Sequence, residues 1–176
     1  MKEFLADQSE SSIDGSNIEI TQVSLFCLQI ALAEVWKSYG IQPAAVIGHS
    51  MGEVAAAYIS GALSLRDAVK VILIRSRLLQ SATQKGAMVA IESPVEEIIP
   101  EIQKNSDLLG IAACNSTSST VVSGDADAVA ELASKLEERG IMCRLLRTTG
   151  VAGHSPQVKP QRVLLVEALN DLHPQP

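Results

Sequence analysis

The stretch Ile47-Gly48-His49-Ser50-Met51-Gly52-Glu53 decides how the rest of this sequence is interpreted. It places a Gly-x-Ser-x-Gly pentapeptide between an apolar run, 44–47, and a small-residue helical pattern, 54–59. A strand, a sharp turn and a helix in that order form a nucleophile elbow, on which the serine hydroxyl is exposed. We therefore expect Ser50 to be a nucleophile. The backbone N–H of Met51, at the helix start, would then point at a developing oxyanion.

The interpretation of Ser50 as a nucleophile depends on the residues that flank the pentapeptide, because Gly-x-Ser-x-Gly alone is common in loops. We expect 44–47 to be a strand of a parallel sheet. Gly48 and Gly52 would let that strand and the following helix pass closely, since glycine has no Cβ.

The composition favours one aliphatic core. The chain has 176 residues, of which 47% are hydrophobic and only 3% aromatic, and its net charge is −6. This suits one domain of helices packed on a sheet, with room for a small subdomain. No basic patch indicates nucleic acid as a partner. Cys27, Cys114 and Cys143 lie in apolar runs without metal-ligand spacing, so we expect buried free thiols in a reducing compartment.

The termini and apolar runs predict a cytoplasmic protein. The first ten residues include Lys2, Glu3, Asp7 and Glu10 and contain no apolar signal-peptide core. We see no apolar run as long as a membrane span and expect no membrane association. Residues 1–17 are polar and serine-rich, which is typical of a loop.

Periodicity and turn residues predict two structural units. Residues 20–39 and 65–82 have helical patterns, and Ser64 with Asp67 forms a variant of a capping box. From residue 86 the order is strand, helix, strand, strand, helix, strand, at 88–91, 94–104, 108–114, 120–123, 125–139 and 141–146. This order is that of a ferredoxin-like α+β fold. A last helix is expected at 158–169. The fold class is therefore α/β: a hydrolase-like parallel-sheet core, 1–85 and 148–176, with an inserted ferredoxin-like subdomain, 86–147.

A serine nucleophile needs a base, and the chain has three histidines. His49 adjoins Ser50 and cannot easily fold back from a tight turn, so we expect it to pack and hydrogen-bond beside the elbow. His173 lies in a proline-rich tail and should be solvated. His154 lies in a small-residue loop and is the favoured base, with a plain surface histidine as the alternative. No acidic third member is obvious, and backbone or amide oxygens could orient His154 instead.

One arginine stands among apolar residues of the second predicted helix. Arg75 is flanked by Ile72, Ile74 and Leu78, so it should lie on or near the apolar face, where it needs an anion. Its planar fork suits a substrate carboxylate. A structural ion pair with Glu34 or Asp67 is an equal alternative. Arg77 is interpreted as a solvated charge and Trp36 as a packing anchor.

Taken together, these residues resemble a known family. The segments carrying the likeness are 48–53, Ala55-Ala56-Ala57, Gly61-Ala62-Leu63-Ser64-Leu65, Asp67-Ala68, Arg75-Ser76-Arg77, Asn115 with Val121-Val122-Ser123-Gly124, and His154-Ser155-Pro156-Gln157. Their order is similar to that in the acyltransferase domain of modular polyketide synthases and, more distantly, in malonyl-CoA:acyl-carrier-protein transacylases. The likeness runs from about Thr21 onward.

The resemblance implies a role for each matching position. Ser50 would carry the acyl group as an ester, His154 would be the base, and Met51 N–H would be one oxyanion donor. Arg75 would pair with the free carboxylate of a malonyl-type unit. Coenzyme A thioester would be the donor and the phosphopantetheine thiol of an acyl carrier protein the acceptor, with no bound cofactor or metal. A ketosynthase would be a flanking domain.

Further positions match the substrate-binding part of the family's site. These are His49, Asn115, Val151 and Gly153. Segment 151–154 lies where the family varies with extender choice, and a bulky aromatic at position 153 resembles the malonyl-selective pattern. Gly153 leaves space, which implies a 2-substituted unit such as methylmalonyl.

The sequence also departs from the family pattern. The family's domain is longer, and the Gly-Gln-Gly loop that supplies a second oxyanion donor is not present before Ser50. We therefore expect the middle of such a domain, with an unpaired sheet edge and weakened transition-state stabilisation. Two alternatives stay open: a hydrolase-like serine esterase, which has no use for Arg75 in its acyl pocket, and a truncated remnant that folds without turnover.

Overall fold

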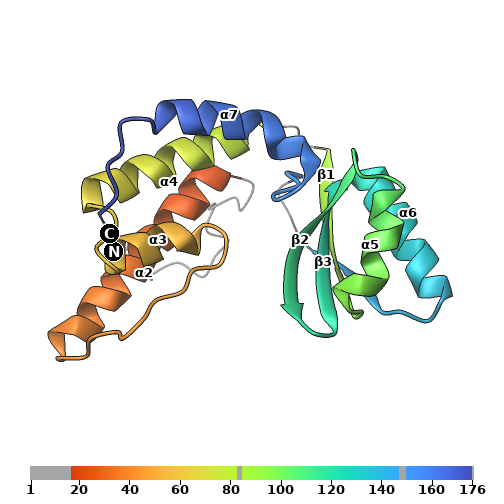
Figure 1. Ribbon diagram of the computed structural model, residues 1–176, viewed down its shortest axis with the longest axis horizontal. Coiled ribbons are helices and arrows are strands. Elements are labelled where there is room, and N and C mark those ends of the chain that lie inside the picture. Colours follow the sequence, from red (N-terminus) through yellow and green to blue (C-terminus); the bar gives the residue numbers. More distant parts are fainter. Residues whose placement is uncertain (1–16, 83–84, 147–149, 176) are drawn as a thin grey trace, which may run out of the picture.

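The computed structural model describes residues 17–82, 85–146 and 150–175, so the expected N-terminal loop lies almost wholly outside the described residues. Figure 1 shows a helical body and a sheet body side by side. The helical body contains α2 (Ile18–Ser38), α3 (Gly52–Ile59), α4 (Leu65–Gln80) and α7 (Lys159–Ala168). The sheet body holds the chain between α4 and the last loop. The site described below lies between the two.

Capping side chains begin the two long helices of the helical body. Asn17 Oδ1 accepts a hydrogen bond from the N–H of Ile20 at the start of α2. Ser64 Oγ accepts from the N–H of Asp67 at the start of α4 and donates to the Asp67 carboxylate, as the capping-box pattern predicts. Helices α2, α3 and α4 pack around a small aliphatic core with one aromatic residue, composed of Phe26, Val54, Ala55, Ala68 and Ile72.

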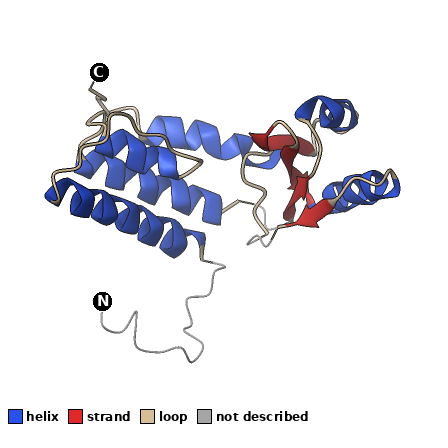
Figure 2. Cartoon of the chain, turned by 90° about the horizontal axis from the view of Figure 1, so that it is seen from below, coloured by secondary structure: helices blue, strands red, loops and turns tan. Residues whose placement is uncertain are grey.

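The sheet body has the predicted order of elements. Its members are β1 (Gly86–Ile91), α5 (Val95–Gln103), β2 (Leu109–Ser116), β3 (Ser119–Asp125), α6 (Ala126–Glu138) and β4 (Cys143–Leu145). The strands pair antiparallel in the order β2-β3-β1-β4. Both helices cover the face turned away from the helical body (Figures 1 and 2), where Val89, Ile91 and Val122 pack against Ile98 and Leu136. The open face of the sheet is turned toward the helical body.

The expected strand at 44–47 is not formed. These residues are an exposed loop, and the side chain of Ile47 is 98% exposed. A strand needs a hydrogen-bonded neighbour, and no described residue pairs with this segment by a backbone hydrogen bond. The described residues accordingly contain one antiparallel sheet and no parallel one. The coarse α/β class holds, but the parallel core is absent from the part of the chain that the structure describes.

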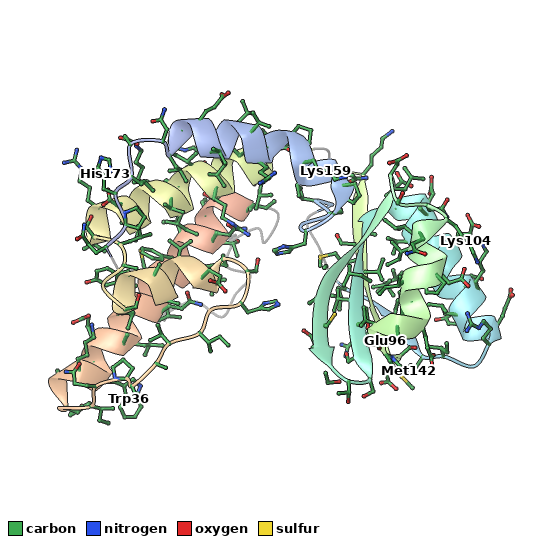
Figure 3. The ribbon with its side chains drawn as sticks, viewed as in Figure 1. Trp36, Glu96, Lys104, Met142, Lys159 and His173 are labelled. Atoms are coloured by element: carbon green, nitrogen blue, oxygen red, sulfur yellow. The ribbon has the colours of Figure 1, made fainter. Side chains whose placement is uncertain are left out.

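Three further expectations need correction. Cys27 and Cys114 are exposed, and Cys143 is only half-buried although it packs against the core of the sheet body. Trp36 is 58% exposed (Figure 3), at the end of the helical body farthest from the sheet, so it is no packing anchor here. The expectation that no apolar run is as long as a membrane span is wrong by length and composition alone, because helix α2 passes that test. Core helices and signal sequences pass the same test, so it is weak evidence of membrane association.

Candidate active site

The elbow places Ser50 directly before helix α3. Ser50 has a φ of +53°, a left-handed conformation that is rare for residues other than glycine. The turn is closed by hydrogen bonds from the N–H of Gly52 to the carbonyl of His49, 2.9 Å, and from the N–H of Glu53 to that of Ser50, 3.1 Å. Strained backbone of this kind is concentrated at functional sites. The helix of the elbow is therefore present although the preceding strand is not.

Only one of the two glycines is required by close contact. A Cβ on Gly48 would lie 2.3 Å from the backbone nitrogen of Glu53. At Gly52 the nearest atom to such a Cβ is 3.8 Å away, in the side chain of Gln29. The expectation that both glycines permit a close approach is thus right for Gly48 and wrong for Gly52, where the first turn of α3 leaves room.

Replacing Gly48 by alanine should destabilise the elbow, whereas replacing Gly52 by alanine should not. Overpacking of this kind costs about 1–3 kcal/mol of unfolding free energy. For a domain of this size that corresponds to a fall of roughly 2–12 °C in Tm. Thermal unfolding followed by circular dichroism measures both variants. Equal losses in the two would contradict the assignment of Gly48 as the contact position.

His154 reaches the elbow from a loop between the two bodies. It also has a positive φ, +62°. Ser155 anchors the loop: its buried Oγ donates to the carbonyl of Ala152, 2.7 Å, and accepts from the N–H of Gln157, 3.2 Å, at the start of the 3₁₀ turn η1 (Pro156–Val158). The outcome is a distance of 2.8 Å between His154 Nε2 and Ser50 Oγ. Residues 104 apart in sequence are thereby within hydrogen-bond distance.

Arg75 lies on the other side of the same hydroxyl. Its Nη2 donates to Ser50 Oγ over 3.2 Å. Since Oγ accepts this bond, the serine's own proton is free to point toward His154 Nε2. The structural ion pairs weighed as the alternative do not occur: Glu34 pairs with Lys37 and Asp67 bonds Ser64. Among the described residues, no carboxylate forms an ion pair with Arg75.

The surroundings of His154 favour its neutral form. Partial desolvation lowers the pKa of His154, and the positive charge of Arg75 and the neighbouring His49 lower it further. A neutral imidazole with a free Nε2 lone pair is the form that accepts a proton. No carboxylate among the described residues bonds to the ring. Within that same part of the chain, no three acidic, histidine or cysteine side chains could hold a metal ion.

A cavity of about 420 Å³ between the two bodies contains this constellation. Four other expected site residues also line it: His49, Asn115, Val151 and Gly153. Val151 is buried, while His49 is exposed rather than packed, because the segment before it has no neighbour. Met51 does not line the cavity. It precedes the first residue of α3, and its side chain packs on the helical core. His173 is exposed in the C-terminal segment, as expected (Figure 3).

Sequence reasoning missed one residue of the site. Gln22 lines the cavity, and its Oε1 accepts a hydrogen bond from Arg75 Nη1, 2.5 Å. A signal for it exists in the sequence. Gln22 stands four residues after Ile18 and four before Phe26, both buried, so a polar side chain interrupts an apolar helical stripe.

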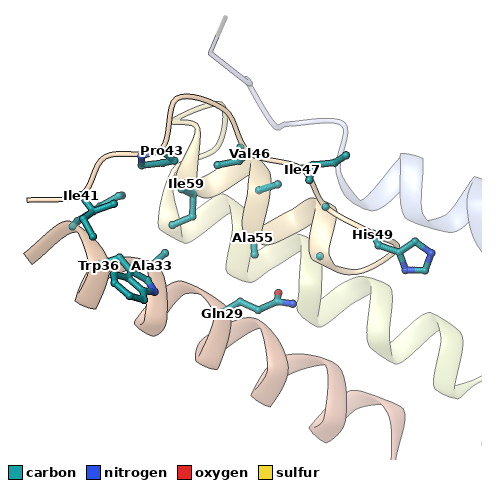
Figure 4. Close-up of a pocket in the computed structure, with 14 residues that line it drawn as sticks. Gln29, Ala33, Trp36, Ile41, Pro43, Val46, Ile47, His49, Ala55 and Ile59 are labelled. Carbon is teal, nitrogen blue, oxygen red and sulfur yellow. The ribbon is translucent and has the colours of Figure 1, made fainter. Parts of the chain in front are cut away.

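A larger cavity, of about 510 Å³, opens on the outer side of the elbow (Figure 4). It is lined mainly by apolar side chains of α2, α3 and the 41–47 loop, including Trp36, Ile41, Val46 and Ile59. His49 borders both cavities. Ser50, Arg75 and His154 line the 420 Å³ cavity and do not line the 510 Å³ cavity. Chemistry at Ser50 therefore belongs to the cavity between the bodies.

Known proteins are similar to this chain in sequence and in fold. A model of the acyl transferase domain matches residues 2–176. A mycocerosic acid synthase-like polyketide synthase of Mycolicibacterium smegmatis is 45% identical over 160 residues, which are 90% of this chain and 8% of that protein. The acyltransferase domain from module 8 of the salinomycin polyketide synthase has a TM-score of 0.88 at 38% identity, over 96% of this chain and 40% of that one.

A second solved structure agrees with the first. The acyltransferase domain of phenolphthiocerol/phthiocerol synthase A from Mycobacterium bovis has a TM-score of 0.86 at 34% identity, over 91% of this chain and 60% of that one. The chain therefore spans only part of the length of the proteins that it matches. With a family match along nearly its whole length, and with its relatives among polyketide synthases, the chain belongs to the acyl transferase domain family.

Proposed function

We propose that Ser50 accepts a malonyl-type acyl unit from a coenzyme A thioester and passes it to the phosphopantetheine thiol of an acyl carrier protein. The observation that carries this proposal is the run of hydrogen bonds Arg75–Ser50–His154 inside one cavity. An esterase acting on neutral esters would have no use for a cation without a carboxylate partner at this place. The family match supports acyl transfer in general, and the cation supports an acidic acyl unit.

In the proposed first half-reaction Ser50 Oγ attacks the thioester carbonyl while its proton moves to His154 Nε2. The negative charge on the carbonyl oxygen would be met by the N–H of Met51 at the start of α3. When the C–S bond breaks, the thiolate takes the proton from His154 and leaves as coenzyme A, so that Ser50 is an ester and the imidazole is neutral again. The second half-reaction runs in reverse with the carrier thiol as nucleophile.

The proposed choice of acyl unit depends on Gly153. Apart from Gly153 itself and its two neighbours in the chain, no described residue has an atom within 4 Å of the position that a Cβ would take on this glycine, and Gly153 lines the cavity beside His154. This space accommodates a substituent on C2 of the unit, so a methylmalonyl-type unit is the proposed substrate. A single methyl group in an apolar pocket gives about 10- to 200-fold discrimination at most.

The proposal extends to the organisation of the protein. Residues 86–147 would form an inserted ferredoxin-like subdomain, a proposal that the observed strand order supports. Residues 1–85 with 148–176 would form a hydrolase-like core. Asn115 and His49 would contribute to substrate binding. The great length of the relatives suggests a ketosynthase and other polyketide synthase domains as neighbours, in the cytoplasm.

Incubation with methylmalonyl-CoA and malonyl-CoA in competition, followed by intact-protein and peptide mass spectrometry, tests the proposal. We expect an ester adduct on the peptide containing Ser50, with methylmalonyl in excess over malonyl. An adduct dominated by malonyl would refute the choice of acyl unit only. No adduct from either donor would refute transfer by this chain and would favour a remnant that folds without turnover.

A further inference from the structure

Arg75 is a cation without a carboxylate partner among the residues that the structure describes. Every ion pair found there joins other side chains. Burial lowers the pKa of Arg75, as desolvation does for a positive charge. Removing a charge from water without compensation is costly. The hydrogen bonds that the guanidinium makes in the cavity must therefore compensate for part of this cost.

Gln22 is the side chain in place to do so. It lies on α2 between the buried residues Ile18 and Phe26, on the face that packs against α4. Its Oε1 accepts from Nη1 of Arg75 over 2.5 Å, while Nη2 of the same guanidinium donates to Ser50. Hydrogen bonds thus connect Gln22, Arg75, Ser50 and His154 in a continuous chain from α2 to the last loop.

We propose that Gln22 is a positioning residue that holds the guanidinium of Arg75 at Ser50 and leaves its positive charge free for the substrate carboxylate. The neutral amide matters as much as the hydrogen bond. A glutamate at position 22 would accept the same hydrogen bond but would offset the positive charge of Arg75, which the substrate carboxylate needs. An alkyl side chain would accept no hydrogen bond and would leave the guanidinium free to rotate. This inference rests on the proposed function, because it deepens the role of Arg75 in binding an acidic acyl unit.

The first test compares Gln22→Met with Gln29→Met, the same substitution two turns further along α2. Gln29 borders the outer cavity, and the described hydrogen bonds of Arg75 go to Gln22 and Ser50, so Gln29 is a matched control. Loss of a hydrogen bond to a charged group should raise the KM for methylmalonyl-CoA about tenfold or more, with kcat little changed. Labelling by neutral acetyl-CoA should not change. Equal effects on charged and neutral donors, or no effect at all, would overturn the assignment.

A second test needs no turnover. The pKa of His154 is read by NMR in the unsubstituted protein, Gln22→Met and Gln22→Glu. The charged and titratable groups that face His154 are Arg75 from α4, His49 from the elbow and Arg162 from α7, and Arg75 is the one that Gln22 contacts. Gln22→Glu should neutralise Arg75 and raise the pKa of His154, whereas Gln29→Glu should not. An unchanged pKa in Gln22→Glu would overturn the proposal.

Malonate binding, followed on the same His154 resonance, separates this inference from the proposed function. The dissociation constant of malonate should rise about tenfold in Gln22→Met and stay unchanged in Gln29→Met. If the unsubstituted protein neither binds malonate nor labels at Ser50, the proposed function fails. If it binds malonate and Gln22→Met binds it equally well, only the role of Gln22 fails.

Discussion

Replacing His154 by alanine should lower the rate constant for acylation of Ser50 by about 10²- to 10⁴-fold, the range that a positioned general base supplies. The reason is geometric. Nε2 lies 2.8 Å from Oγ, and Arg75 already donates to that oxygen, so the hydroxyl proton has one base within reach among the described residues. To measure the rate constant, the reaction with methylmalonyl-CoA is quenched at a series of times. The fraction of acylated protein is then quantified by intact-protein mass spectrometry.

The pH dependence of the same rate identifies the base. Because desolvation, Arg75 and His49 lower the pKa of His154, its neutral form persists below the ordinary value of 6.5. The rate should therefore rise with pH, with a midpoint below 6.5, and be constant near neutrality. His173→Ala is the control, because His173 is an exposed histidine of the C-terminal segment. Unchanged labelling in His154→Ala, or an equal loss in His173→Ala, would assign the base elsewhere.

Local patterns predicted most elements because each is stabilised by its own neighbours. The helix at α4 begins at Ser64 with the capping box that the sequence suggests, since that motif needs only residues three apart. The six elements of the sheet body were predicted in order because they pack on one another within 60 residues. Patterns of glycine and small residues likewise drew attention to Ser50 and His154, whose side chains lie 2.8 Å apart.

The features that sequence patterns could not predict depend on contacts with residues that are distant in the sequence. The run 44–47 has the composition of a buried strand but stays an exposed loop, because hydrogen bonds of a strand come from a neighbour and the described residues offer none. Cys27 and Trp36 on α2 are exposed as well. Gln22 was missed for a different reason: its partner is 53 residues away, and no local rule pairs a glutamine with an arginine at that separation.

Replacing Arg75 by alanine should weaken acylation by methylmalonyl-CoA by roughly 10²-fold or more while sparing neutral acyl donors. Truncating one partner of a buried, hydrogen-bonded charge pair costs about 2–5 kcal/mol, much of it from the charge left unpaired. That charge would be the carboxylate of the acyl unit. A neutral donor such as acetyl-CoA has no carboxylate, so its labelling rate should fall little. The ratio of kcat/KM for the two donors is the quantity to measure.

Arg77→Ala provides the matched control for Arg75→Ala, because Arg77 stands two residues further along α4. Its side chain is 64% exposed and pairs with Glu19 on the surface, 2.8 Å from Nε to the carboxylate. An exposed pair of this kind contributes little, so both donors should react as before. Arg75→Ala should also raise the pKa of His154, since the positive charge that lowers it is removed. Equal losses for charged and neutral donors in Arg75→Ala would mean that the arginine supports the shape of the site rather than binding a carboxylate.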